Sequence, residues 1–267
     1  MTEPTSLTSA LHKLLQRAIQ AGGGWIGFDR FMALALYAPG LGYYANSGAK
    51  FGTMPEGVKG EGSDFVTAPE LSPLFGQALA AQVGEALAAT GTDEVWEFGA
   101  GSGALAQQLL GTLGETVRRY TIVDLSGTLR ARQQARLAGF GDTVRWVDAL
   151  PEAIQGVVVG NEVLDAMPVK LLVRQGGQAG GVWWERGVAL EGDALAWADR
   201  PTELRPPVEV EGPQDYLSEI HPQAEAFIAT LADRFRASLQ SGGRGGAAFF
   251  LDYGFPESEY YHAERHM

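Results

Sequence analysis

The sequence contains no cysteine and only four histidines, His12, His221, His262 and His266. The absence of cysteine excludes thiol nucleophiles, disulfide bonds and cysteine-ligated zinc. His262 and His266 lie near each other in the sequence, but no further ligand stands at a spacing that would complete a metal site. We therefore predict no bound metal.

Basic runs and long apolar runs are also lacking. The formal net charge is −12 without a cluster of Lys or Arg, which argues against nucleic-acid binding. An acidic surface would favour a cationic substrate, and it would equally serve solubility. No apolar stretch approaches the ~20 residues that cross a bilayer. Residues 7–19 repeat apolar side chains at helical spacing instead of forming a signal-peptide core. We expect a cytoplasmic protein without a membrane span, or a mitochondrial-matrix protein if the source is eukaryotic; the sequence predicts no oligomeric state.

The most informative stretch is Val95-Trp96-Glu97-Phe98-Gly99-Ala100-Gly101-Ser102-Gly103. An apolar strand with the carboxylate Glu97 near its end is followed by a glycine-rich loop, and a helix-forming segment, Ala104 to Leu113, begins directly after it. Glycines let the backbone turn tightly and approach a ligand, and a helix N-terminus directs amide hydrogens at it. The pattern predicts a nucleotide-type site.

A second predicted strand, Tyr120 to Val123, ends in Asp124, where an acidic residue usually holds a ribose diol. Three interpretations fit. In the first, Gly99 and Gly101 match the loose dinucleotide fingerprint, with Ala104 in place of the third glycine. In the second, Glu97 and the three glycines form the E-x-G-x-G-x-G pattern typical of class I methyltransferases. In the third, the glycines make an ordinary strand-to-helix turn without a ligand. Glu97 favours S-adenosylmethionine over a nicotinamide cofactor, because its carboxylate would accept from an ammonium group and repel a pyrophosphate.

The alternation of strands and helices predicts an α/β fold with a parallel sheet. We expect strands at 93–98, 118–124, 143–147 and 156–161, helices at 103–113 and 126–138, and a further buried strand at 247–251. Helices are expected at 5–21, 26–38, from Pro69 onward, and from Tyr216 to Leu239. Antiparallel strands at 169–173, 182–186 and 194–198 form an expected insertion at 169–211. The predicted division is a helical N-terminal extension with a cofactor-covering loop, 1–90, and a Rossmann-like core, 91–267.

Several motifs in this order resemble the MidA family of mitochondrial complex I assembly methyltransferases. The most specific are Asp64-Phe65-Val66-Thr67-Ala68-Pro69-Glu70-Leu71-Ser72 with Phe75-Gly76, and Gly160-Asn161-Glu162-Val163-Leu164-Asp165-Ala166-Met167-Pro168-Val169. Phe31-Met32-x-x-Ala35-Leu36-Tyr37, Gly40-x-Gly42-Tyr43-Tyr44, the glycine loop and Asp252-Tyr253-Gly254-Phe255 complete the likeness.

The resemblance implies a class I methyltransferase fold that uses S-adenosylmethionine and releases S-adenosylhomocysteine. It also implies a protein substrate with an exposed arginine, since the family's animal members are taken to methylate an arginine of a complex I core subunit during assembly. Two features depart from the family pattern. Asp124 stands where Glu is usual, and the chain stops at Met267, in what looks like the middle of the family's sequence, so that more sheet and substrate-binding surface are expected beyond it.

We expect Glu97 to hold the amino-acid end of the cofactor through the glycine loop, Asp124 to take the ribose hydroxyls, and Asp148 to accept from the adenine amine. A helix cap is the other interpretation of Asp148. The segment Asp64 to Phe75 is expected to lie over the cofactor. The predicted cofactor-binding set is Thr67, Pro69, Glu97, Gly99, Ala100, Gly101, Ser102, Gly103, Asp124, Leu125, Asp148, Ala149 and Asn161.

Asn161 and Glu162 follow the fourth strand, where the reacting amine is placed in this fold class. An arginine guanidinium stays protonated in water, so a methyl-accepting nitrogen needs carboxylates that bind and polarise it. We predict Glu162 as the first catalytic carboxylate and Asp165 as the second. They would share a face if the turn is helical; a capping pair before Pro168 is the alternative. An assembly chaperone that keeps the cofactor site as a fold element, and a nicotinamide oxidoreductase, remain open as other functions.

Overall fold

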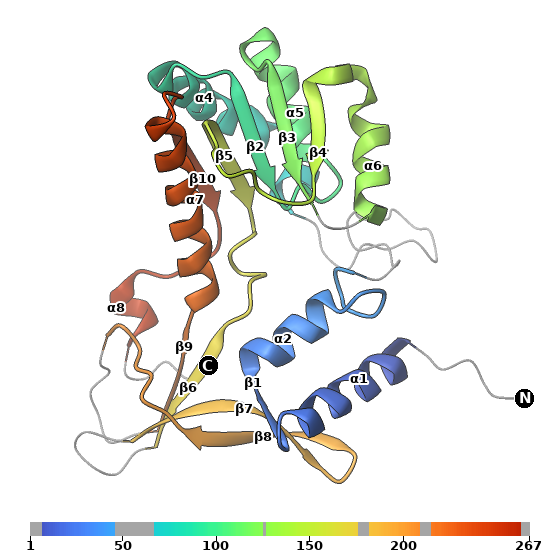
Figure 1. The fold of residues 1–267 in the computed structure, drawn as a ribbon, viewed down its shortest axis with the longest axis vertical. Helices are drawn as coiled ribbons and strands as arrows, with labels where there is room; N and C mark the ends of the chain where they lie inside the picture. Colours follow the sequence, from blue (N-terminus) through green and yellow to red (C-terminus); the bar gives the residue numbers. More distant parts are fainter. Residues whose placement is uncertain (1–6, 46–66, 125–126, 176–181, 209–214, 263–267) are drawn as a thin grey trace, which may run out of the picture. The chain divides into compact units, whose positions relative to one another are not determined.

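The computed structural model describes residues 7–45, 67–124, 127–175, 182–208 and 215–262 (Figure 1). The chain forms two compact units. The first comprises residues 1–46, 167–226 and 253–267, and the second comprises 47–166 and 227–252. All the predicted site residues belong to the second unit. Within the described ranges, no helix is both long enough and apolar enough to cross a membrane.

A five-stranded sheet in the order β10-β5-β2-β3-β4 forms the centre of the second unit. All of its neighbouring strands pair in parallel, which confirms the predicted α/β sheet. The chain leaves β2 for β3 and β4 on one side, whereas β5 and β10 lie on the other. Ligands of such sheets bind outside the carboxyl ends of the strands at this switch point. The strands are β2 (Glu94–Phe98), β3 (Arg119–Val123), β4 (Val144–Val147), β5 (Gly156–Asn161) and β10 (Gly246–Leu251).

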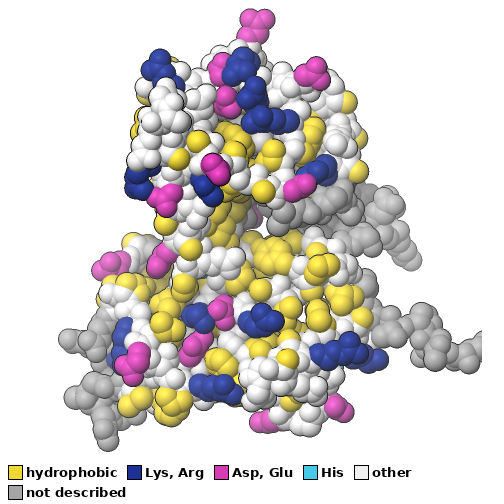
Figure 2. All heavy atoms as spheres, in the orientation of Figure 1, with side chains coloured by type: hydrophobic (Ala, Val, Ile, Leu, Met, Phe, Trp, Pro, Cys, Tyr) yellow, Lys and Arg dark blue, Asp and Glu magenta, His cyan; other side chains and the backbone are white. Residues whose placement is uncertain are grey.

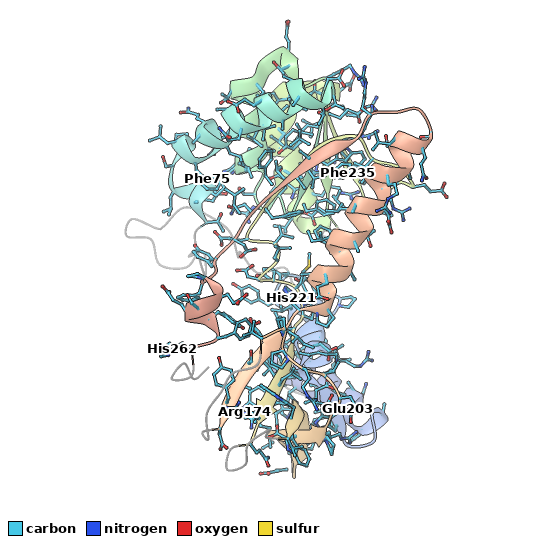
Figure 3. All side chains as sticks on the ribbon, turned by 90° about the vertical axis from the view of Figure 1, so that its left-hand side faces the viewer. Phe75, Arg174, Glu203, His221, Phe235 and His262 are labelled. Atoms are coloured by element: carbon cyan, nitrogen blue, oxygen red, sulfur yellow. The ribbon has the colours of Figure 1, made fainter. Side chains whose placement is uncertain are left out.

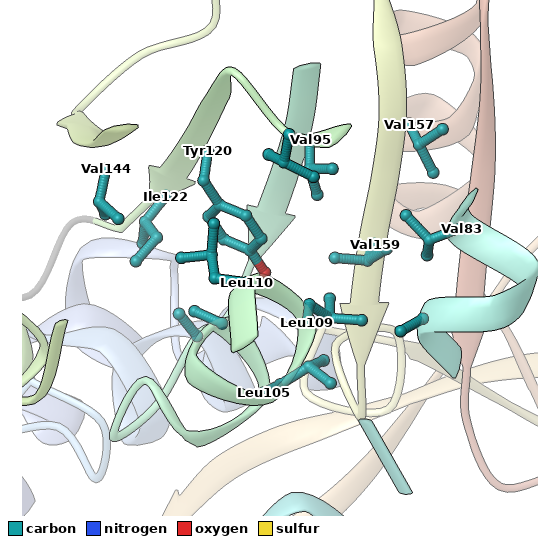
Figure 4. Close-up of a cluster of buried hydrophobic side chains, with 14 of the residues drawn as sticks. Val83, Val95, Leu105, Leu109, Leu110, Tyr120, Ile122, Val144, Val157 and Val159 are labelled. Atoms are coloured by element: carbon teal, nitrogen blue, oxygen red, sulfur yellow. The ribbon is translucent and has the colours of Figure 1, made fainter. Parts of the chain in front are cut away.

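Helices cover both faces of this sheet because successive side chains point to opposite faces and the central strands carry apolar residues on both. On one face, side chains of α4 and α5 pack against Val95, Tyr120 and Val159 (Figure 4). On the other face, Leu231 of α7 packs against Trp96. Figure 3 places Phe75 and Phe235 on these opposite faces. The helices of this unit are α3 (Ala68–Leu71), α4 (Pro73–Thr90), α5 (Ala104–Leu113), α6 (Gly127–Leu137) and most of α7 (Pro222–Gln240), with short 3-10 turns η1 (Gly114–Thr116) and η2 (Ala138–Thr143).

The first unit contains an antiparallel sheet in the order β1-β7-β6-β9, with β8 paired to β7. The antiparallel strands expected between 169 and 211 are confirmed, and the sheet extends beyond that range. Leu172, Trp183 and Tyr216 form one small core, and Ile19, Ile26 and Val188 form another. The elements are α1 (Leu7–Ala21), β1 (Trp25–Gly27), α2 (Phe28–Tyr37), β6 (Lys170–Arg174), β7 (Trp183–Glu191), β8 (Ala194–Pro201), β9 (Tyr216–Ile220) and α8 (Glu257–Tyr260).

Three of the predicted helices were wrong in part. Tyr216–Ile220 is a strand that pairs with β6, and the helix begins only at Pro222. Trp25–Gly27 pairs with β7, so the helix expected from residue 26 begins at Phe28. The helix expected from Pro69 onward is divided at Ser72, whose extended backbone ends α3 and whose hydroxyl accepts from Leu74 N at the start of α4.

Charged side chains of both signs mix on the described surface. Figure 2 shows Lys and Arg interspersed with Asp and Glu over the face that it presents. Several charges are paired within one unit, such as Arg186 with Asp199 and Lys170 with Glu185. On this face, charges of both signs are therefore mixed, and no large field of a single sign stands out.

Candidate cofactor and acceptor site

The glycine loop joins β2 to α5 at the carboxyl edge of the parallel sheet. Gly99, Gly101 and Gly103 have φ values of 64°, 52° and 84°, a backbone region that residues with a Cβ rarely adopt. Gly103 N donates to Ala100 O at 2.7 Å and closes the loop. No described side chain caps α5. Its first amide N–H groups can therefore receive an anionic or polar ligand group.

Glu97 lies inside the unit, on the same face of β2 as Val95. Its side chain is buried, and Tyr120 Oη donates to Glu97 Oε2 at 2.8 Å. Burial raises the pKa of Glu97 to about 8, the hydrogen bond from Tyr120 opposes this, and the charge of Asp124 adds to it. Burial also raises the pKa of Tyr120, which keeps its hydroxyl protonated as the donor. The structure thus places Glu97 in a buried pair with Tyr120, and its predicted role toward the cofactor stays a prediction.

Asp124 follows β3 and is held by a residue that the sequence did not single out. Gln133 on α6 is fully buried, and its Nε2 donates to Asp124 Oδ2 at 2.7 Å and to Gly101 O at 3.0 Å. Trp146 Nε1 donates to Gln133 Oε1 at 2.9 Å, which fixes the orientation of the amide. One glutamine therefore ties the predicted ribose carboxylate to the glycine loop. A glutamine on an amphipathic helix gives no sequence signal of such a role.

Asp148 follows β4 and is the outermost of the predicted cofactor carboxylates. Its side chain is 74% exposed and pairs with Arg130 Nη2, which also donates to Asp124 O at 3.1 Å. Arg130 thereby links the ends of β3 and β4. Ala149 is exposed beside Asp148. Leu125 lies outside the described residues.

The loop after β5 carries the predicted catalytic residues. Glu162 has a φ of 51°, the only positive φ of a residue other than glycine in the described chain. Its N–H donates to Leu251 O at 2.8 Å, and Asn161 Nδ2 donates to Glu162 Oε1 at 3.4 Å. The loop is not helical, so the helix face that Glu162 and Asp165 were expected to share does not form. A strained backbone at such a position is a feature found at functional sites.

Asp252, at the end of β10, holds this loop and was not predicted as a site residue. Its Oδ2 accepts from Leu164 N at 2.8 Å and from Asp165 N at 3.2 Å. Burial, followed by the charge of Asp252, raises the pKa of Asp165. Asp252 therefore fixes the turn that follows Glu162 and adds negative charge to it.

The glycine loop contacts the loop that follows β5, residues 162–169, which we call the acceptor loop. A Cβ added to Gly99 would lie 2.9 Å from Val163 Cγ2, and one added to Gly160 would lie 3.2 Å from the same atom. The pairing of Phe98 with Gly160 sets the two loops side by side. The structure therefore brings the predicted cofactor loop and the predicted catalytic loop together.

The segment before α4 also reaches the glycine loop. Pro69 is buried, Thr67 is half-buried, and Glu70 contacts Ser102. Residues 64–66 of the expected covering segment lie outside the described residues. Among the described residues, no group of three or more His, Cys, Asp or Glu could hold a metal ion.

Comparison with known proteins decides the family. The family model described as "Putative S-adenosyl-L-methionine-dependent methyltransferase" matches residues 78–267, more than half of the chain. The chain belongs to the MidA family. This confirms the resemblance that the sequence motifs indicated.

Two solved structures resemble this MidA-family chain over nearly its whole length. A protein from Burkholderia thailandensis, solved bound to S-adenosyl-homocysteine, is 46% identical with a TM-score of 0.83, covering 99% of this chain and 68% of that one. A native crystal structure of a protein from the same organism is 44% identical with a TM-score of 0.77, covering 99% of this chain and 67% of that one.

The curated relatives are more distant. The chain is 26% identical to "Protein arginine methyltransferase NDUFAF7 homolog, mitochondrial" of Caenorhabditis elegans, covering 97% of this chain and 65% of that protein. It is also 26% identical to "Protein arginine methyltransferase NDUFAF7, mitochondrial" of Danio rerio, covering 94% of this chain and 63% of that protein. The chain thus spans somewhat less than two thirds of the length of these relatives.

Proposed function

We propose that this chain binds S-adenosylmethionine at the switch point of its parallel sheet and transfers the methyl group to an arginine of a protein partner. The observation that carries the proposal is the contact between the glycine loop and the acceptor loop at Gly99 and Val163. It places a cofactor-type loop against the residue that follows Glu162, in a chain of this methyltransferase family.

The residues at the site fit the cofactor. The glycine loop and the open N-terminus of α5 offer amide donors close to the backbone. Asp124, oriented by Gln133, suits a ribose diol, and the exposed Asp148 suits the adenine amine. The similar Burkholderia thailandensis structure contains S-adenosyl-homocysteine, which supports the same class of ligand here.

The bound cofactor would supply a methyl group that is already activated by its sulfonium, so the chain needs no nucleophile of its own. Its residues bind and orient the acceptor, which can lower a barrier by several kcal/mol. In the reaction, one N–C bond would form at the guanidinium as the S–C bond breaks, S-adenosylhomocysteine would leave, and the proton lost by the nitrogen would pass to water. Glu162 is our first choice for binding and polarising the guanidinium, and Asp165 is the second.

The choice of arginine rests on charge and on relatives. Glu162, Asp165 and Asp252 make the acceptor side acidic, and the whole chain carries a formal net charge of −12. A guanidinium retains its charge and can be held by carboxylates in a fixed orientation. The curated relatives are named protein arginine methyltransferases. Protein arginine is therefore the acceptor that the site favours.

The test is methyl transfer by the parent chain and by Glu162→Gln. Each purified chain would be incubated with isotopically labelled S-adenosylmethionine and with lysate protein from cells that lack the gene. Labelled methylarginines would then be mapped by mass spectrometry. We expect the variant to keep its affinity for S-adenosylhomocysteine and to lose at least about tenfold in rate, because the lost charge acts on the acceptor. Glu152→Gln, an exposed change on the loop before β5, is the control.

Two results would contradict parts of this proposal. A parental rate for Glu162→Gln would transfer the role to Asp165 or to another residue. If no arginine methylation depends on the protein while it still binds the cofactor, the assembly-chaperone function replaces the enzymatic one.

A further inference from the structure

Glu70 joins three elements around the glycine loop. Its side chain is only 7% exposed, although α3, which carries it, is a short helix. Ser102 Oγ of the glycine loop donates to Glu70 Oε1, and Arg136 Nη1 of α6 donates to the same oxygen at 3.2 Å. Arg136 Nη1 also donates to Ser102 Oγ. One carboxylate oxygen therefore connects α3, the glycine loop and α6.

A second set of contacts holds the same segment on α5. Gln108 Nε2 donates to Pro69 O at 2.7 Å, and Gly76 N donates to Gln108 Oε1 at 3.0 Å. A Cβ on Gly76 would lie 2.3 Å from that oxygen, so the approach of α4 to Gln108 requires glycine. The junction between α3 and α4 is thus bound to α5 on both sides of Ser72.

A carboxylate so well buried is costly unless charged or polar partners compensate it. Here the guanidinium of Arg136 and the hydroxyl of Ser102 provide that compensation. Both partners belong to elements of the predicted cofactor site: Ser102 is in the glycine loop, and Arg136 lies on α6, whose Gln133 holds Asp124 and Gly101 O. Loss of the Glu70 carboxylate would therefore leave α3, the glycine loop and α6 less firmly held to one another.

We propose that Glu70 is a positioning residue of the cofactor site, which acts through Ser102 and Arg136 to set the glycine loop against Thr67 and Pro69. The inference rests on the proposed function, because it concerns the binding of the same cofactor. In this proposal, the short helix α3 is already bound to the glycine loop before any ligand arrives.

The test is calorimetric titration of the 267-residue chain with S-adenosylhomocysteine. Glu70→Ala removes a charge-assisted hydrogen bond, and we expect it to weaken binding by about tenfold or more. Glu70→Gln keeps an acceptor oxygen for Ser102 and should restore part of the affinity. In a double-mutant cycle, Glu70→Ala with Arg136→Ala should cost less than the sum of the two single changes. Glu85→Gln, an exposed change on α4, is the matched control.

The outcomes separate this inference from the proposed function. Failure of the parent chain to bind S-adenosylhomocysteine would overturn the proposed function and the inference with it. If the parent binds but Glu70→Ala binds equally well, only the positioning role is refuted. Hydrogen exchange adds a second readout: Glu70→Ala should speed exchange at residues 99–105 in the absence of ligand, whereas unchanged exchange there would overturn the inference.

Discussion

The buried pair of Glu97 and Tyr120 predicts how the stability of this protein depends on pH. The pKa of Glu97 is raised from 4.5 to about 8 in the folded chain, chiefly by burial. Below pH 4.5 the carboxyl group is protonated in both the folded and the unfolded states, and its contribution is fully present. Between pH 4.5 and 8 the unfolded state releases the proton while the folded state retains it, so this contribution falls as pH rises.

The magnitude follows from the same values. Each tenfold change in proton concentration corresponds to about 1.4 kcal/mol, so Glu97 should lower the free energy of unfolding by about 5 kcal/mol between pH 4.5 and pH 8. Glu97→Gln keeps the shape and an acceptor for the Tyr120 hydroxyl but does not titrate. Its stability relative to the parent should therefore rise steadily from pH 5 to pH 8.

The assay is urea unfolding of the parent and of Glu97→Gln across this pH range. Glu115→Gln, at an exposed position in η1, serves as the control and should follow the parent. A difference between Glu97→Gln and the parent that stays constant from pH 5 to pH 8 would refute the reasoning, because it would mean that Glu97 is ionised in the folded chain.

Three further predictions concern the site. Asp124→Ala should weaken binding of S-adenosylhomocysteine by about 10- to 100-fold through the loss of a charge-assisted hydrogen bond; unchanged affinity in calorimetry would remove Asp124 from the site. Gln133→Leu should weaken it by about tenfold, because Asp124 and Gly101 lose their shared donor, and a parental dissociation constant would contradict this. Asp252→Ala should reduce methyl transfer by about tenfold or more with little change in cofactor affinity, since the turn after Glu162 loses its acceptor; Asp252→Asn should recover part of the rate, and equal rates for all three chains would refute the role.

Much of the parallel-sheet unit could be predicted because its signals are local. The glycines between β2 and α5, and the acid after β3, lie where the sequence placed them, since strand, turn and helix each have a short-range pattern. The strand Tyr216–Ile220 was missed because its residues suit a helix as well, and its pairing partner in β6 lies far away in the sequence. Short strands of this kind depend on tertiary pairing more than on propensity.

The polar network of the site was harder to predict than the fold. Glu97 is buried because it shares a strand face with Val95, and its partner Tyr120 comes from the neighbouring strand. Gln133 and Glu70 act through atoms of residues that lie far away in the sequence. A glutamine or glutamate on a helix usually faces water, and no sequence pattern marks the few whose side chains hydrogen-bond inside the protein.

The most direct test of the central claim is calorimetric titration of the chain with S-adenosylhomocysteine and, separately, with NAD. The glycine loop beside the acceptor loop, in a chain of the MidA family, predicts micromolar binding of S-adenosylhomocysteine and no binding of NAD. Binding of NAD at micromolar concentration without binding of S-adenosylhomocysteine would contradict the proposed function and favour an oxidoreductase.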